Sequence, residues 1–230
     1  SAPGPYLQGC TASVGVSTFG ENSLLYRPLG RTSLNVSLLS LGSGGAKRLG
    51  QTEGLTQGQQ TAIVRRALDL GVNLIDTSAN YGESESILGK ALQEVPREAY
   101  ILSTKWSAET NGTFPGDPSL LTDSVEQSLR HLSTDHVEIM FFHGPLAHQL
   151  PMIIDRFYPT MERLRDEGKI QFIGLSTQYA AEPSQVVADV ALKMSPELWD
   201  VIMLKYGILN QHMAKETLPL AVEHGIGIMN

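Results

Sequence analysis

Short apolar runs alternate with helical segments along most of this chain, and no other feature of the sequence restricts the fold as strongly. The runs expected to be strands cover residues 73–75, 100–104, 137–142, 171–175 and 200–204, and another begins at 226. Between them, apolar residues recur at helical spacing, as Ile63, Val64, Ala67 and Leu68 do before Gly71. Strands that alternate with helices of this length form βαβ units around a parallel sheet. The sequence therefore predicts an α/β fold.

The ends of the predicted strands indicate which α/β fold this is. Five successive strands end at a polar or aromatic residue, namely Asp76, Lys105, His143, Ser176 and Tyr206. Neighbouring members of this series are 29 to 38 residues apart, and one unit of a (β/α)8 barrel takes about 31 residues. In such a barrel all carboxyl ends of the strands meet at one mouth, whereas an open doubly wound sheet would spread them over two layers. The spacing favours the (β/α)8 TIM barrel.

The composition divides the chain into two parts. Residues 1–23 are rich in Gly, Ser and Pro and have little periodicity, which predicts an N-terminal arm, and residues 24–230 are expected to form one barrel domain. The domain begins with a predicted hairpin across residues 26–36. The glycine-rich segment 42–46 lacks the third glycine of a dinucleotide-binding turn, so we interpret it as a tight turn beneath the barrel mouth. Residues 144–159 are predicted to be a long loop over the same mouth.

Charge and cysteine content exclude several classes of partner. The 17 basic and 24 acidic residues give a formal charge of -7, which disfavours nucleic acid because its binding needs clustered Lys and Arg. No apolar run approaches the roughly 20 residues of a membrane-spanning helix.

The single cysteine, Cys10, fits a reducing compartment. We therefore expect an intracellular protein, in the cytoplasm or in an organelle lumen such as a matrix or stroma. Apart from His143, the histidines show no metal-ligand spacing, so no metal site is predicted.

Four of the polar residues near the strand ends suggest a reactive site. Asp76 ends a buried strand, where an unpaired charge would be costly, and Lys105 at the end of the next strand offers the opposite charge. Tyr81 follows Asp76 by five residues, and His143 ends the strand after Lys105. Taken singly, each has an ordinary structural explanation as a turn cap, a solvated strand end, a loop residue or a packed side chain. Their joint occurrence in register predicts a common site.

Over residues 24–230 the chain resembles the aldo-keto reductase superfamily. The resemblance rests on Leu29-Gly30-Arg31-Thr32 in the opening hairpin, on Asp76 with Tyr81-Gly82, and on Lys105, His143 and Gly174-Leu175-Ser176 at the later strand ends. Two further segments, 206–210 and 218–221, are more similar to the bacterial and plant-like sugar or small-aldehyde dehydrogenases and reductases than to the steroid-converting branch.

This resemblance implies the NAD(P)H-dependent reduction of an aldehyde, ketone or sugar carbonyl, or the reverse oxidation. Tyr81 would be the general acid, and Lys105 would promote ionisation of its phenol. Asp76 would hold Lys105 in place and compensate its charge. His143 would orient the substrate carbonyl through a hydrogen bond, for which a neutral imidazole suffices.

The resemblance also implies a site for NADP(H) or NAD(H). Ser176 and Thr177 would bind the nicotinamide carboxamide, and Tyr206 would stack against the nicotinamide ring. Many relatives carry Asn at the position of Thr177 and Gln at the position of Met203, so this chain departs from the family pattern at two expected cofactor contacts.

The chain is expected to be C-terminally incomplete, because it stops at Asn230 inside the predicted seventh strand. The eighth strand would lie beyond Asn230, with the family's Arg- and Asn-containing segment that grips the adenosine phosphate. Seven strands leave two unpaired edges, so a protein partner that covers the open edge is also expected. Two functions remain open: an oxidoreductase of small carbonyl or sugar substrates, and a non-catalytic subunit or scaffold that has lost the dinucleotide clamp.

Overall fold

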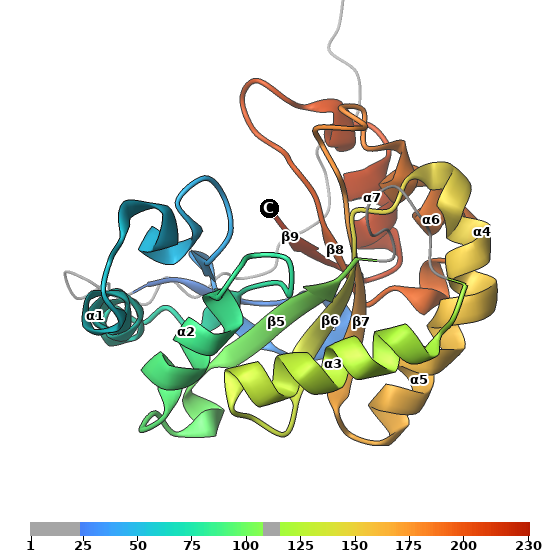
Figure 1. Cartoon of the computed structure of the whole chain (residues 1–230). Coiled ribbons are helices and arrows are strands. Elements are labelled where there is room, and N and C mark those ends of the chain that lie inside the picture. Colours follow the sequence, from blue (N-terminus) through green and yellow to red (C-terminus); the bar gives the residue numbers. More distant parts are fainter. Residues whose placement is uncertain (1–23, 108–115) are drawn as a thin grey trace, which may run out of the picture.

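The computed structural model describes residues 24–107 and 116–230, so the predicted N-terminal arm, residues 1–23 with Cys10, lies outside the described residues. Seven parallel strands follow one another in chain order and form a curled sheet (Figure 1). These strands are β3 (Leu41–Gly42), β4 (Leu74–Asp76), β5 (Ile101–Trp106), β6 (Val137–His143), β7 (Ile170–Ser176), β8 (Val201–Met203) and β9 (Gly227–Met229). This arrangement confirms the predicted incomplete (β/α)8 barrel.

Helices connect successive strands and lie outside the sheet (Figure 1). They are α1 (Gln57–Asp69), α2 (Ser84–Leu92), α3 (Ser119–Leu132), α4 (Leu150–Met152), α5 (Tyr158–Asp166), α6 (Val186–Met194) and α7 (Thr217–Glu223). Local sequence sets the bounds of α1, because Thr56 and Gln59 form a capping box at its start and Gly71 has φ 91° just past its end.

The prediction of a loop at residues 144–159 is wrong. A 3₁₀ turn at Ala147–Gln149 leads into α4, a π-helical turn at Ile153–Phe157 and α5, so this connection is almost wholly helical. Pro151 and Pro159 occupy first-turn positions, where the missing N–H costs little. Apolar side chains at helical spacing are buried in the core, namely Leu150, Ile153, Phe157, Met161 and Leu164. The free energy gained by burying these side chains exceeds the cost of placing two prolines in the helical segments.

Alternation along the strands sorts side chains into an inner and an outer core. On β5 and β6 the outward-facing Leu102, Met140 and Phe142 pack against the helices. The inward-facing Ile139 and Phe141 belong to a separate cluster with Leu29, Val36, Leu74, Val201 and Met229. Because successive strand residues point to opposite faces, any residue two positions beyond an inner one also faces the barrel interior.

A predicted hairpin closes one end of this interior. β1 (Tyr26–Pro28) pairs antiparallel with β2 (Asn35–Ser37) across a 3₁₀ turn, which confirms the hairpin. Asn73, just before β4, accepts a hydrogen bond from Ser37 N and donates one to Asn35 O. Arg31 N donates to Gly225 O near the start of β9. The hairpin therefore sits at the amino-terminal ends of the strands and leaves the carboxyl ends as the mouth.

The sheet has two edges, β3 and β9, and in the described part of the chain each has a single strand neighbour. A cavity of about 560 Å3 lies along these edges, lined by Gly42 and Asp76 on one side and by Met229 and Asn230 on the other. None of the described helices is long and apolar enough to cross a membrane.

Candidate active site

The folded chain gathers the four predicted site residues at the carboxyl ends of three adjacent strands. Asp76 ends β4, Lys105 lies near the end of β5 and His143 ends β6. All three share strand parity with inner-core residues, so their side chains face the barrel interior. Tyr81 lies in the turn between β4 and α2. Backbone pairing in the sheet therefore fixes the positions of the three strand residues, whereas the position of Tyr81 depends on a loop.

Asp76 and Lys105 form a buried ion pair. Lys105 Nζ donates to Asp76 Oδ2 at 2.6 Å and to the Thr77 carbonyl at 2.7 Å, and the Lys105 side chain is 1% exposed. Ser103, which pairs with Asp76 across the strands, donates to Asp76 Oδ1 at 2.7 Å. Both carboxylate oxygens are therefore satisfied, as a buried charge requires. The prediction that Asp76 has Lys105 as its partner is confirmed.

Tyr81 packs against this pair and against His143. Lys105 Nζ lies 4.8 Å from the centroid of the Tyr81 ring. The Tyr81 and His143 rings meet edge to face, with centroids 5.7 Å apart and an interplanar angle of 83°. No hydrogen bond joins the Tyr81 hydroxyl to another described residue, which leaves it available to a ligand. Catalytic hydrogen bonds are often long or absent before substrate binds.

Backbone of the loop after β3 lies against the Tyr81 ring. A Cβ atom on Gly44 would stand 2.6 Å from Cε2 and 2.7 Å from Cζ of Tyr81, so only glycine permits this approach. The tight turn predicted at residues 42–46 therefore forms one wall of the space that holds the Tyr81 phenol.

Gln51 fixes the turn that carries Tyr81. Its Nε2 donates to the Tyr81 carbonyl at 3.1 Å, to Ser84 Oγ at 2.8 Å and to the Arg48 carbonyl at 2.7 Å, while its Oε1 accepts from Glu83 N at 2.9 Å. One side chain from the loop after β3 therefore holds the part of the turn after β4 that leads into α2. Such bonds restrict a loop that strand pairing does not reach.

His143 is neutral near pH 7. Burial and, to a smaller extent, the nearby Lys105 ammonium together lower its pKa to about 4. Its Nδ1 lies 3.1 Å from Oγ of Ser78, a residue with no exposed surface. A neutral imidazole at this position can donate a hydrogen bond from one nitrogen to a substrate oxygen, as the resemblance implies.

The three predicted cofactor contacts lie on β7 and beyond β8. Ser176 pairs with His143 across the strands, and its hydroxyl accepts from Gly144 N at 3.0 Å. The Thr177 hydroxyl donates to Gln185 Oε1 at 2.7 Å, so its proton is already engaged. Tyr206 is 38% exposed, three residues past the end of β8. An exposed ring and a strand-end hydroxyl at the mouth fit a stacked nicotinamide, whereas Thr177 retains only acceptor capacity.

Gln185 organises this side of the mouth and is not evident from the sequence. It is fully buried and has φ 53°, an unfavourable conformation for a residue with a Cβ. Its amide binds Thr177 Oγ1 and both the N–H and the carbonyl of Lys205. It therefore fixes the chain segments just before Tyr206 and just after Ser176.

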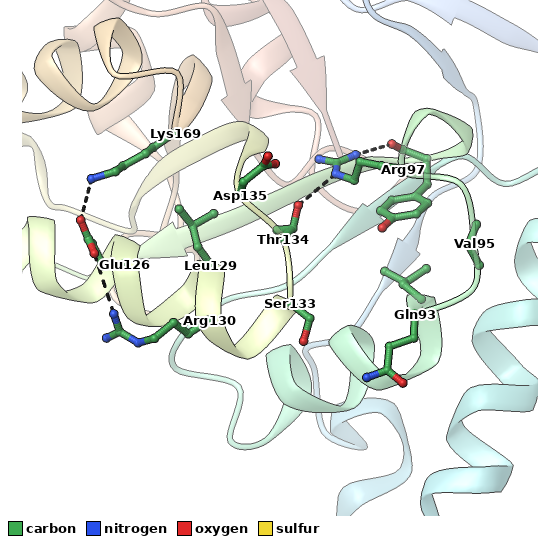
Figure 2. Close-up of a pocket in the computed structure, with 12 residues that line it drawn as sticks. Gln93, Val95, Arg97, Glu126, Leu129, Arg130, Ser133, Thr134, Asp135 and Lys169 are labelled. Atoms are coloured by element: carbon green, nitrogen blue, oxygen red, sulfur yellow. Dashed lines mark hydrogen bonds and ion pairs between the residues drawn. The ribbon is translucent and has the colours of Figure 1, made fainter.

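A second hollow lies at the opposite end of the strands. It is a surface groove of about 680 Å3, lined by residues that precede β5, β6 and β7 and by residues of α3. Figure 2 shows the side chains that line it. Its cations are paired, since Arg97 binds Glu138, and Lys169 and Arg130 both bind Glu126. The amino-terminal end of a barrel contributes to stability, and chemistry occurs at the other end. None of the predicted site residues lines this groove.

Comparison with known proteins agrees with this geometry. The family model of the aldo/keto reductase family matches residues 40–230. L-galactose dehydrogenase of Arabidopsis thaliana is 33% identical over 211 residues, covering 89% of this chain. NADH-specific methylglyoxal reductase of Escherichia coli is 30% identical over 220 residues, covering 86%. D-threo-aldose 1-dehydrogenase of a Pseudomonas species is 27% identical over 221 residues, covering 84%.

Solved structures show the same relationship. An aldo-keto reductase from Bacillus halodurans in its holo form superposes with a TM-score of 0.72 at 28% identity, covering 90% of this chain and 65% of that one. Its apo form gives a TM-score of 0.68 at 29% identity, with 89% and 63% covered. The present chain spans 63 to 65% of the length of the three relatives compared by sequence. By the extent of these matches, the chain belongs to the aldo/keto reductase family.

Proposed function

We propose that this chain carries the active site of an NAD(P)H-dependent oxidoreductase that reduces the carbonyl of an aldehyde, ketone or sugar, or oxidises the corresponding alcohol. The observation that carries the proposal is the buried Lys105–Asp76 pair beside the Tyr81 phenol, with Nζ 4.8 Å from the ring centroid. A buried cation next to a phenol stabilises the phenolate that remains after proton donation. Relatives named as a methylglyoxal reductase and as sugar dehydrogenases support this reaction class.

In reduction, the Tyr81 hydroxyl donates its proton to the carbonyl oxygen as that oxygen gains negative charge. Lys105 compensates the phenolate, and Asp76 keeps the ammonium in place through the 2.6 Å contact. His143 donates a hydrogen bond to the same oxygen and orients the carbonyl. Proton donation by a positioned side chain contributes about 10²- to 10⁴-fold to the rate, and positioning and electrostatics contribute the rest. Solvent then returns a proton to Tyr81.

A nicotinamide dinucleotide supplies the hydride when it is bound. Tyr206 would stack on its ring, and Ser176 would contact its carboxamide. Thr177 would accept a hydrogen bond from the amide, because its own proton is donated to Gln185. Titration with NADPH and with NADH, followed through the fluorescence of the two tryptophans, Trp106 and Trp199, tests this assignment. Saturable quenching by one of them is expected, and its absence with both would contradict cofactor binding.

The reaction is tested by following the absorbance of the reduced cofactor with a panel of small aldehydes, ketones and aldoses. We expect Tyr81→Phe to abolish turnover and to leave folding unchanged, because only the hydroxyl is removed. Tyr100→Phe is the matched control, since Tyr100 lines the groove at the opposite end of the strands. An active Tyr81→Phe protein would rule out the phenol as the proton donor.

A non-catalytic scaffold is the second candidate, and it is favoured by the engagement of the Thr177 proton with Gln185, which leaves one expected cofactor contact without a donor. Such a protein would bind neither dinucleotide and would turn over no carbonyl. It would also tolerate Tyr81→Phe without any functional change. The cofactor titration therefore separates the two candidates directly.

A further inference from the structure

Ser78 is a buried hydroxyl that lies against His143 and has had no assigned role. It follows β4 by two residues, and none of its surface is exposed. Three groups surround its Oγ: His143 Nδ1 at 3.1 Å, Asn80 N at 3.2 Å and the Lys105 carbonyl at 3.5 Å. The hydroxyl thus connects the Tyr81 loop, the Lys105 strand and the imidazole.

The chemistry of these three neighbours restricts where the hydroxyl proton can go. Asn80 N–H is a donor, so Ser78 Oγ accepts from it. The single hydroxyl proton then goes to the Lys105 carbonyl or to His143 Nδ1. The distance to the carbonyl is at the outer limit of a hydrogen bond, whereas 3.1 Å to Nδ1 lies well within it. The shorter contact favours donation to Nδ1.

We propose that Ser78 is a positioning residue that donates to His143 Nδ1 and so holds the imidazole proton on Nε2. A neutral imidazole carries one proton, and a nitrogen that accepts a hydrogen bond is the one without it. In the described part of the chain Nε2 has no hydrogen-bond partner, so its N–H is available to a ligand. The other tautomer would present a lone pair to the substrate oxygen and repel it.

The catalytic consequence of this arrangement rests on the proposed carbonyl reduction, but the tautomer itself does not. The pKa of His143, lowered to about 4 by burial and by Lys105, means that the ring is neutral and that the tautomer matters at neutral pH. In other enzymes, the group that holds a catalytic histidine in its correct tautomer is essential to the rate. Ser78 supplies that function here through a neutral hydroxyl.

The experiment measures ring nitrogen shifts of histidine in 15N-labelled protein at pH 7. The chain has six histidines, and the signals absent from His143→Gln identify His143. We expect an unprotonated Nδ1 and a protonated Nε2 in the unmodified protein and in Ser78→Thr, which keeps the hydroxyl. Ser78→Ala should shift Nδ1 toward the protonated value. A protonated Nδ1 in the unmodified protein, or no change in Ser78→Ala, would overturn the proposal.

Ser43→Ala is the matched control, because Ser43 is also fully buried near the mouth and its hydroxyl has no described partner. It should leave the His143 signals unchanged. In turnover assays Ser78→Ala should lower kcat by about tenfold, with little change in KM, since one hydrogen bond to the reacting oxygen is lost. If no carbonyl is reduced by any form while the shifts behave as expected, the proposed function fails and the tautomer assignment stands.

Discussion

The Lys105 ammonium lies 4.8 Å from the centroid of the Tyr81 ring and is simultaneously held by Asp76 at 2.6 Å. This places a buried positive charge beside a phenol without consuming the hydroxyl. The charge is compensated by a carboxylate whose second oxygen is bound by Ser103. The folded site depends on both members of the ion pair, because removing either one leaves an unpaired buried charge.

Removing Lys105 should expose the cost of an unpaired carboxylate. In Lys105→Met, Asp76 would keep its charge in a site where its side chain is 13% exposed, and breaking such a pair costs about 3 to 5 kcal/mol. The double variant Lys105→Met/Asp76→Leu should recover much of that stability in urea unfolding. Both variants should lack carbonyl reduction. A double variant no more stable than the single one would show that the unpaired carboxylate is not the source of the lost stability.

The pKa of His143 gives a specific pH dependence of stability. Since its folded value of about 4 lies below the usual 6.5, the unfolded chain binds more protons between these two values. The contribution of His143 is therefore complete above pH 6.5 and is lost as the pH falls toward 4, by at most about 3 kcal/mol. Urea unfolding of His143→Gln should lack this part of the pH dependence. The exposed His148→Gln should retain it.

Gly44→Ala should impair catalysis more than folding. The new Cβ would overlap Cε2 and Cζ of Tyr81, so the phenol must shift from its present position beside Lys105 or the loop after β3 must move. A displacement of about 1 Å can cost about 10²-fold in rate. Gly42→Ala is the matched control, because a Cβ there meets no atom within 4 Å. Equal kcat values for the two variants would refute the importance of this contact.

Gln51→Ala should loosen the turn that carries Tyr81. The variant loses the hydrogen bonds that the Gln51 amide makes to the turn and to Arg48, which at this partly exposed position amount to about 1 to 2 kcal/mol in the free energy of unfolding. Hydrogen exchange of the Glu83 amide should accelerate, and kcat should fall. The exposed Gln93→Ala should change neither quantity. Unchanged exchange at Glu83 would mean that the turn is held by other contacts.

Sequence reasoning located the strands but misjudged one connection. The ends of the apolar runs, 29 and 38 residues apart, were sufficient to place Asp76, Lys105 and His143 at strand ends around one barrel mouth. The same reasoning predicted a loop across residues 144–159, although Pro151 and Pro159 lie in first turns where proline is tolerated. Apolar spacing at Leu150, Ile153 and Phe157 was the signal that would have predicted the helix.

The sequence alone determined the order of strands and helices, the positions of Asp76, Lys105 and His143 at strand ends and the family resemblance, because these depend on local periodicity and short motifs. Only the tertiary structure decided how Gly44, Gln51 and Ser78 act on Tyr81 and His143. Those contacts join residues that are 30 to 65 positions apart, and no periodic pattern specifies them. These side chains are far apart in the sequence and come into contact only when the sheet curls and its loops close over the mouth.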